Sequence, residues 1–169
     1  DAAEVQHRHI LAGLREAANR LPADIVNEVT KAGLRGRGGA GFPTGRKWST
    51  VAAASGARKY VCCNADEGDS GTFADRMLLE GDPFVVLEGV TIAAHAVGAD
   101  EAYFYIRSEY PAAIEVVREA ISIWQAAGHN QVGGRSVEFY VRRGAGAYIC
   151  GEESSMLQSI EGKRGEVRA

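Results

Sequence analysis

Three observations predict an α/β fold with a mainly parallel sheet. Short apolar segments typical of strands alternate along the chain with longer segments of helical periodicity. Prolines precede several of the helical segments, where they fit the first helical turn. Strands separated by helices are typical of parallel neighbours in one sheet. The 169 residues have the length of one domain, with no internal repeat and no linker-like boundary.

Three helices are expected before the first strand. Residues 3–19 form an amphipathic helix, residues 22–32 a second helix that ends at Gly33, and residues 44–54 a short third helix. The first of these carries apolar residues at helical spacing: Ile10, Leu14, Ala17 and Leu21.

Strands are expected over residues 58–63, 101–107 and 136–143. The first is a compact apolar run that ends before Asn64 and is predicted to be buried. In the third, apolar and polar residues alternate. Its apolar positions are Val137, Phe139 and Val141.

The remaining helices follow these strands. Residues 73–79 form one or two helical turns, and residues 83–98 an apolar helix. A helix beginning at Pro111 has one apolar face, made of Ile114, Val117, Ile121 and Trp124. The last helix covers residues 152–161, and three of its side chains are expected to face inward: Met156, Leu157 and Ile160.

Composition excludes several classes of function. A net charge of −3 gives no electrostatic reason for binding nucleic acid or an anionic membrane. The longest apolar stretch, residues 84–97, is too short to span a membrane. The three cysteines include no C-x-x-C pair, so no zinc or iron–sulfur site is expected in this chain. Their odd number, without a signal peptide, predicts a reducing, cytoplasmic location.

Glycine is in excess, at 21 of 169 residues, and gathers in loops, above all in "LRGRGGAGFPTGRKW" (34–48). The spacing of Gly36, Gly38 and Gly41 fits G-x-G-x-x-G, which by itself is a weak sign of dinucleotide binding. A helical segment precedes it and Pro43 follows, whereas the usual fingerprint needs a strand before and a helix directly after. A phosphate loop of the Walker type is also excluded, because no Gly-Lys-Ser/Thr triplet occurs.

Charge favours a binding loop over a flexible turn in this segment. Backbone N–H groups and four cations occur together there, which suits phosphate or an electron-rich ring. The cations are Arg35, Arg37, Arg46 and Lys47.

Two further loops follow predicted strands. "CCNADEGDSGTFADR" (62–76) brings an amide and carboxylates to the end of a strand, where open α/β sheets bind ligands. "GAGAYICGEES" (144–154) repeats this design before a helix. Each has a simpler interpretation, as a solvated acidic loop or as acidic residues favoured in a first helical turn. The cysteines Cys62, Cys63 and Cys150 are expected to be buried and inert, and His95 to be a hydrogen-bonded core residue.

Together the segments "GLRGRGGAGFPTGRKW", "NADEGDSGTFADR" and "RRGAGAYICGEE" resemble the family of NADH-binding flavoprotein (FMN) subunits of respiratory complex I. The resemblance covers roughly residues 25–169, with the three motifs in the same order. "EGDSGTFADRM" and "GDPF" look most like the diaphorase subunits of soluble NAD-linked formate dehydrogenases and NAD-reducing hydrogenases.

The resemblance implies a Rossmann-like three-layer domain whose atypical glycine-rich loop binds FMN and NADH. Hydride would pass between nicotinamide and flavin, and electrons would pass to or from iron–sulfur clusters. The implied partners are an iron–sulfur subunit of the thioredoxin-like ferredoxin type and a larger catalytic subunit. The resemblance implies no direct membrane insertion.

Domain organisation follows from the same resemblance. Residues 1–33 form a helical lead-in and residues 34–169 the FMN/NADH-binding domain. The chain is expected to be a fragment that lacks the ubiquitin-like and iron–sulfur helical domains. A non-catalytic nucleotide-binding or docking module is the alternative function.

The resemblance also assigns residues to the two cofactors, and no catalytic side chain is needed because the cofactors carry the hydride. The implied FMN contacts are Gly36, Arg37, Gly38, Lys47, Asn64, Asp66, Glu67, Tyr148, Gly151 and Glu152. The implied NADH contacts are Gly39, Ala40, Gly41, Phe42, Asp69 and Glu153. A carboxylate at Asp69 would bind the ribose 2′-hydroxyl and repel the 2′-phosphate of NADP, which predicts a preference for NAD(H).

Overall fold

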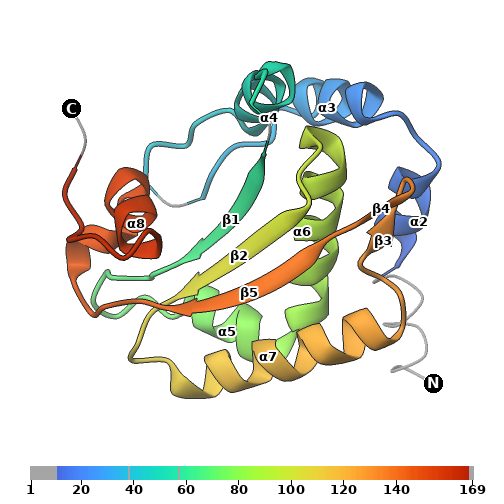
Figure 1. The fold of residues 1–169 in the computed structure, drawn as a ribbon. Coiled ribbons are helices and arrows are strands. Elements are labelled where there is room, and N and C mark those ends of the chain that lie inside the picture. The colour runs from blue at the N-terminus through green and yellow to red at the C-terminus, as the bar shows by residue number, and fades with distance from the viewer. Residues whose placement is uncertain (1–10, 38, 57, 168–169) are drawn as a thin grey trace. The chain divides into compact units, whose positions relative to one another are not determined.

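A computed structural model describes residues 11–37, 39–56 and 58–167 of the chain (Figure 1). Its helices are α2 (Ala12–Ala18), α3 (Pro22–Lys31), α4 (Thr44–Ala53), α5 (Ala74–Gly81), α6 (Pro83–Val97), α7 (Pro111–Ala126), the 3₁₀ turn η1 (Tyr148–Gly151) and α8 (Glu153–Ile160). Its strands are β1 (Tyr60–Ala65), β2 (Glu101–Ile106), β3 (Gln131–Val132), β4 (Arg135–Ser136) and β5 (Glu138–Arg143).

Within the described residues, the larger sheet has the order β1-β2-β5, and its strands run parallel (Figure 1). Backbone pairing continues just past the carboxyl ends of the strands. Arg107 N donates to Ala65 O at 3.2 Å, and Gly144 N donates to Ile106 O at 2.7 Å. The mainly parallel sheet predicted from the sequence is therefore confirmed, and the strand ends meet at one edge.

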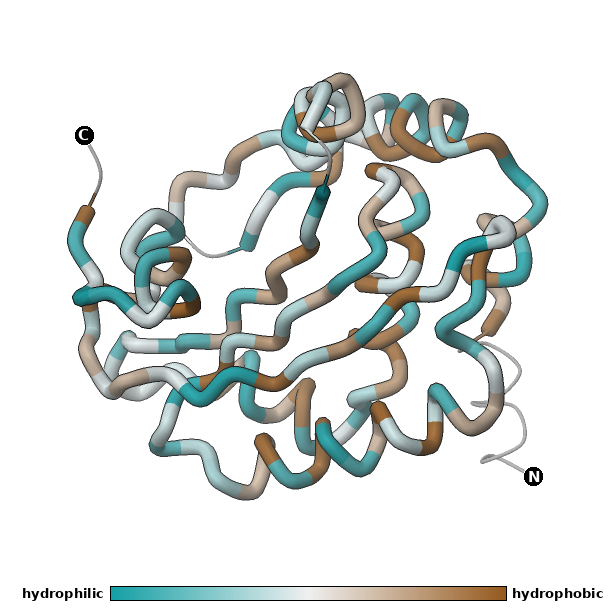
Figure 2. The backbone as a smooth tube through the Cα atoms, viewed as in Figure 1, coloured by the Kyte–Doolittle hydropathy of each residue, from teal (hydrophilic) through white to brown (hydrophobic). Residues whose placement is uncertain are grey.

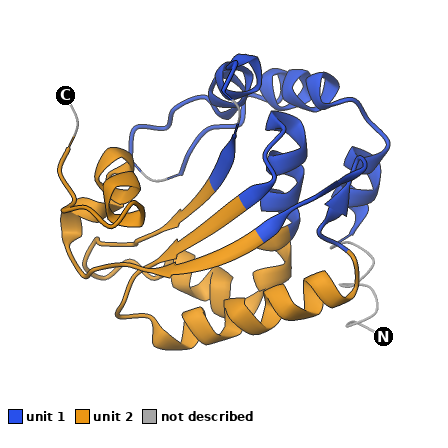
Figure 3. Cartoon of the chain, in the orientation of Figure 1, with its two compact units in different colours: residues 1–61, 88–101, 129–138 blue, residues 62–87, 102–128, 139–169 orange. Residues whose placement is uncertain are grey.

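The described chain divides into two compact units (Figure 3). Unit 1 comprises residues 1–61, 88–101 and 129–138, and unit 2 comprises residues 62–87, 102–128 and 139–169. The predicted boundary after residue 33 falls inside unit 1. None of the helices in the described part of the chain has the length and apolar character needed to cross a membrane.

Unit 1 has a small core formed where helices α2, α3, α4 and α6 meet. Its buried members are Ala17, Ile25, Val26 and Ala96, with Trp48 and Ile92 packed against them. Leu21, predicted to continue the apolar face of the first helix, is instead 70% exposed. The reason is that α2 ends at Ala18 and Leu21 is the extended residue before α3. The part of the predicted helix over residues 3–10 lies outside the described residues.

Helices α3 and α4 approach closely in unit 1 because a glycine lies at their contact. Gly45 is buried, and a Cβ atom built on it would lie 2.2 Å from Thr30 Oγ1 and 2.6 Å from Thr30 Cα. Any larger residue would therefore force the two helices apart.

A β-hairpin in unit 1 was not predicted. Gly133 and Gly134 form the turn between β3 and β4, with φ of 57° and 78°. Two adjacent residues with positive φ are typical of a two-residue hairpin turn, and Gly-Gly is a known signal for it. Ser136, predicted to begin the third strand, instead belongs to β4, and the observed strand β5 begins at Glu138. His95 is 5% exposed, and its Nε2 lies 3.2 Å from Arg20 O, as expected for a core histidine.

Unit 2 buries β2 on both faces, as the predicted three-layer domain requires. Phe104 and Tyr105 are neighbours on the strand and point to opposite faces, yet both are almost fully buried. Tyr105 packs with Cys150 of η1 and Met156 of α8. The predicted apolar face of α7 is confirmed, since all four of its residues are buried. Hydrophobic and hydrophilic positions alternate along this helix (Figure 2).

Two burial predictions in unit 2 and at its border are wrong. Strand β1 runs from Tyr60 to Ala65 and is not a buried strand, because only Ala65 is buried and Tyr60 is 46% exposed. An edge strand has one neighbour only, so fewer side chains cover it. Leu157 is 38% exposed, since Met156 and Ile160 make the inward contacts of α8.

Candidate cofactor site

The glycine-rich segment of unit 1 is a closed loop. Gly36 N donates to Phe42 O at 3.0 Å, and Thr44 N donates to Leu34 O at 2.9 Å. Arg35 adds a side-chain bond from Nη1 to Gly41 O at 3.0 Å. The segment therefore leaves α3 and returns to α4 without the strand-to-helix turn of the usual dinucleotide fingerprint, as the sequence predicts.

Phe42 gives this loop an exposed, positively charged aromatic surface. Phe42 is 46% exposed, with the Arg46 guanidinium at 5.8 Å and the Lys47 ammonium at 5.9 Å from the centroid of its ring. Arg46 and Lys47 are both exposed residues, so an anion can approach this surface from solvent. Among the residues assigned to cofactors, Gly36, Arg37, Gly39 and Ala40 are also exposed, and Gly38 lies outside the described residues.

In unit 2, a side chain joins the two predicted loops. Asn64, at the end of β1, donates from Nδ2 to Gly151 O of η1 at 2.8 Å. Its Oδ1 accepts from Asp66 N at 3.2 Å, which closes an Asx turn. Two segments 87 residues apart in sequence are thus fixed to each other at the carboxyl edge of the sheet.

Asp66 has a buried oxygen without a hydrogen-bond partner among the residues that the structure describes, namely Oδ2. Burial raises the pKa of this carboxyl, against the lowering effect of the Arg107 charge. Two glycines lie close to Asp66, one at its backbone carbonyl and one at its carboxyl. A Cβ on Gly151 would lie 3.1 Å from Asp66 O, and one on Gly144 would lie 3.5 Å from Asp66 Oδ1. A buried acceptor of this kind needs a donor from a ligand or from water.

Glu67 has a structural use that the sequence did not reveal. Its carboxylate is buried and caps the start of α5, with Oε1 accepting from Ala74 N at 2.9 Å and Asp75 N at 3.2 Å. Oε2 accepts from the Tyr110 hydroxyl at 3.1 Å. Because these donors occupy the carboxylate, we propose for Glu67 a supporting role in the loop instead of a direct side-chain contact with FMN.

Arg107 and Tyr110 lie at the border of the candidate site, and the sequence motifs did not identify them. Arg107 Nη1 donates to Glu67 O at 2.6 Å, and its guanidinium lies 5.7 Å from the Tyr110 ring centroid. Both residues follow the carboxyl end of β2. The rule that ligands bind beyond strand ends, applied to this strand as well as to its neighbours, would have found them.

Glu152 caps α8. Its Oε2 accepts from Ser154 N and Ser155 N, both at 3.0 Å, and from Ser154 Oγ at 2.6 Å. These bonds, led by the Ser154 hydroxyl, lower the pKa of the Glu152 carboxyl below its ordinary 4.5. Glu153 is the first residue of α8.

Because Glu152 caps α8 through an ionised carboxylate, the stability of this helix should depend on pH. A carboxyl whose pKa is lower in the folded state stabilises the fold above the unfolded pKa of 4.5 and loses that contribution as pH falls through the folded pKa. The Glu152→Ala variant should therefore melt earlier than the wild type at neutral pH, and the difference should vanish in acid. Thermal unfolding followed by circular dichroism between pH 7 and pH 3 measures it. An equal difference at all pH values would contradict the capping role.

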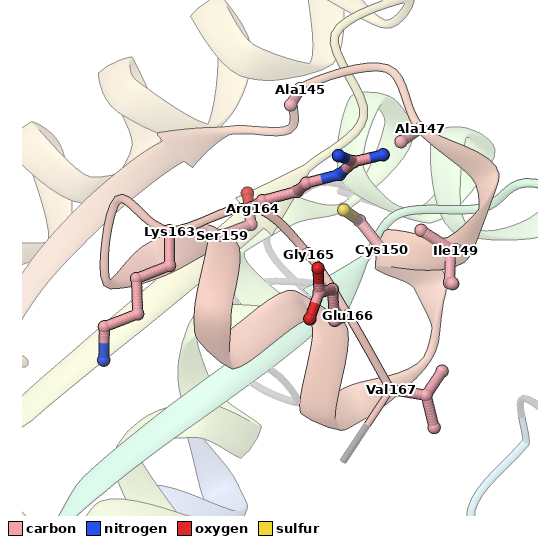
Figure 4. Close-up of a pocket in the computed structure, with 10 residues that line it drawn as sticks. All are labelled: Ala145, Ala147, Ile149, Cys150, Ser159, Lys163, Arg164, Gly165, Glu166 and Val167. Atoms are coloured by element: carbon pink, nitrogen blue, oxygen red, sulfur yellow. The ribbon is translucent and has the colours of Figure 1, made fainter.

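A cavity of about 610 Å³ lies beside η1 and α8 (Figure 4). Its lining residues are Ala145, Ala147, Ile149, Cys150, Ser159, Lys163, Arg164, Gly165, Glu166 and Val167. None of the residues assigned to FMN or NADH lines it, so this cavity is distinct from the candidate cofactor site.

Of the three cysteines predicted to be buried and inert, Cys150 is buried, whereas Cys62 and Cys63 are half-buried. Burial raises the pKa of the Cys62 thiol and raises that of Cys63 to about 12. Both stay protonated at neutral pH, when a thiol is a poor nucleophile. Cys150 is buried in the core cluster of Tyr105 and Met156.

Comparison with known proteins identifies the family to which this chain belongs. The family model described as the Nuo51 FMN-binding domain matches residues 29–169. The chain is 51% identical to an NADH-quinone oxidoreductase subunit of Aquifex aeolicus, over 92% of this chain and 37% of the relative. It is 46% identical to the NADP-reducing hydrogenase subunit HndC of Solidesulfovibrio fructosivorans, over 91% of this chain and 32% of the relative.

Comparison with solved structures points to the same group of proteins. The NAD⁺-reducing [NiFe]-hydrogenase in its H₂-reduced state superposes with a TM-score of 0.83 at 43% identity, covering 90% of this chain and 26% of that chain. Relatives of both the quinone-linked and the hydrogenase type thus match, and the chain spans 37% and 32% of the length of the two relatives named above. The matched region contains all three motifs of the predicted resemblance, so the chain belongs to the Nuo51 FMN-binding domain family.

Proposed function

We propose that this chain is the FMN-binding part of a flavoprotein subunit that oxidises NADH or reduces NAD⁺. The subunit would exchange electrons with the iron–sulfur clusters of a multi-subunit oxidoreductase. One observation carries the proposal. Asn64 and η1 are joined at the carboxyl edge of a parallel sheet, beside the unsatisfied acceptor of Asp66. This is where α/β proteins bind nucleotides.

The residues of unit 2 fit FMN chemically. The ring and ribityl chain of FMN offer N–H and hydroxyl donors, and Asp66 Oδ2 is a buried acceptor in need of one. Gly144 and Gly151 lie close to Asp66, where a side chain at either position would crowd the residue. When bound, FMN supplies the two-electron chemistry that takes hydride from nicotinamide and the one-electron chemistry that serves iron–sulfur clusters.

Each unit contributes its own residues in this proposal. In unit 2, Asn64 and Asp66 hydrogen-bond the cofactor, while Tyr148, Gly151 and Glu152 bound its pocket. In unit 1, exposed backbone N–H groups and cations of the glycine-rich loop bind phosphate and stabilise negative charge on the ring. The proposed FMN residues of unit 1 are Gly36, Arg37, Gly38 and Lys47. The proposed NADH residues of that loop are Gly39, Ala40, Gly41 and Phe42, with Asp69 and Glu153 in unit 2.

Titration of FMN with the protein, followed by quenching of flavin fluorescence, tests the binding. Saturable quenching is the expected result. Absence of quenching in the intact protein, together with binding of another ligand, would favour the docking or nucleotide-binding module instead.

Among the residues of unit 2, Asp66 should contribute most to the affinity for FMN. Loss of a hydrogen bond to a charged group costs about 1.5–3 kcal/mol, so Asp66→Ala should weaken FMN binding roughly tenfold to a hundredfold. Fluorescence quenching gives the two dissociation constants. Glu119→Gln, at an exposed position on α7, is the matched control and should bind FMN like the wild type. Equal affinities for Asp66→Ala and the control would remove Asp66 from the site.

Asp69 should select NAD(H) over NADP(H). A carboxylate repels the 2′-phosphate and accepts a bond from the 2′-hydroxyl, so Asp69→Gln should raise the ratio of NADPH to NADH turnover, expressed as kcat/KM. Steady-state kinetics with both nucleotides measures it. If the ratio stays at the wild-type value, another residue discriminates.

The proposed partners are an iron–sulfur subunit and a larger catalytic subunit, and the proposed location is the cytoplasm. In support, the matching relatives are named as subunits of NADH-quinone oxidoreductase and of hydrogenases.

A further inference from the structure

Tyr148 makes two contacts that fix it, although its side chain is 72% exposed. Its hydroxyl donates to Asp69 Oδ1 at 2.8 Å. Its ring lies against Gly68, where a Cβ would be only 2.7 Å from the ring Cδ2. Glycine is thus the residue that lets the ring approach the loop this closely. Exposed aromatic side chains without such contacts sample several rotamers, whereas this one is held over the 66–72 loop.

In this contact Tyr148 is the donor and the Asp69 carboxylate is the acceptor. A phenol donates to a carboxylate without giving up its proton, and the bond to Asp69 raises the pKa of Tyr148 above its ordinary value of 10. At neutral pH Tyr148 is therefore a neutral donor. It holds Oδ1 and leaves Oδ2 to accept a further hydrogen bond, so the carboxylate has a defined orientation.

We propose that Tyr148 is a positioning residue for nucleotide recognition: it orients the Asp69 carboxylate toward the adenosine ribose of NAD(H). This inference rests on the proposed function. Tyr148 belongs to η1, the turn proposed to border FMN, while Asp69 is the residue of the 62–76 loop proposed to bind the nucleotide. The hydrogen bond between them links the two subsites. An Asp69 carboxylate without this partner would have to lose its rotational freedom at the moment of binding.

The test uses ADP-ribose, which contains the adenosine ribose but no nicotinamide, so that binding is measured without turnover. Calorimetry on the intact protein saturated with FMN compares the wild type, Tyr148→Phe, Asp69→Asn and the double variant. One hydrogen bond is worth about 0.5–1.5 kcal/mol, so Tyr148→Phe should raise the dissociation constant roughly two- to tenfold. In the Asp69→Asn background the same change should have little effect, because Tyr148 acts through Asp69.

Tyr105→Phe is the matched control. It also removes a tyrosine hydroxyl from unit 2, one that donates to Ser159 Oγ at 2.8 Å and does not touch Asp69. Its effect on ADP-ribose affinity should be the same in both Asp69 backgrounds.

The outcomes separate this inference from the proposed function. If the wild type binds ADP-ribose and Tyr148→Phe leaves its affinity unchanged, or weakens it equally in both backgrounds, Tyr148 does not position Asp69. If the FMN-saturated wild type does not bind ADP-ribose at all, the proposed function itself fails.

Discussion

Replacing Gly45 by alanine should destabilise the protein by about 1–3 kcal/mol, the usual cost of overpacking a tight contact. The added Cβ would meet Thr30 at its Oγ1, Cα and backbone N, at 2.2, 2.6 and 2.8 Å. Rotating the threonine side chain would relieve only the first of these clashes. The backbone of α3 would have to move, which would disturb the unit 1 core around Ile25 and Val26. Urea unfolding at equilibrium measures the loss.

Gly89→Ala is the matched control for this effect. Gly89 lies inside α6, also in unit 1, and a Cβ there would meet no atom within 4 Å. Alanine is the better helix former, so this variant should gain about 0.5–1 kcal/mol. If Gly45→Ala also gained stability, the expected clash with Thr30 would be absent, and the close contact of α3 with α4 would be refuted.

Glu67→Ala should cost about 2–4 kcal/mol, because it removes a helix cap and leaves the buried Tyr110 hydroxyl without its acceptor. The donors to the Glu67 carboxylate are Ala74 N, Asp75 N and the hydroxyl of Tyr110. Helix α5 loses its cap, and the loop that follows β1 loses its attachment to the helix. Urea unfolding again measures the effect on stability.

Tyr110→Phe provides the internal comparison for Glu67. It removes only one of the donors, so its cost should be smaller than that of Glu67→Ala. The double variant should be more stable than the sum of the two single changes predicts, since both remove the same bond. Strict additivity would mean that Glu67 and Tyr110 do not interact in solution.

The sequence predicted most elements because local signals determine them. Pro22, Pro83 and Pro111 each begin a helix, as their fixed φ and missing N–H favour. The strands that precede the two acidic loops were placed within a few residues. The exposure of Tyr60 and of Leu157 was not predictable in the same way, because it depends on strand order and on which neighbouring residue reaches the core first.

For the candidate site, the sequence identified the loops but not their internal bonds. Asn64 was correctly placed at the end of β1, yet its bond to Gly151 joins residues far apart in the chain. Glu67 shows the limit most clearly. The resemblance implies an FMN contact for Glu67, and the structure shows in addition that its carboxylate caps α5, which no sequence pattern indicated. Sequence spacing predicts which residues lie near a strand end, but it does not predict the hydrogen-bond partner of each side chain.

Anaerobic addition of NADH to the intact FMN-loaded protein tests the central claim most directly. The proposed hydride transfer predicts that the visible absorbance of the bound flavin falls as NADH is added, in proportion to the nucleotide. Dithionite serves as the control that shows the flavin to be reducible. If dithionite bleaches the flavin and NADH does not, the protein does not transfer hydride from NADH to FMN, and the proposed function is contradicted.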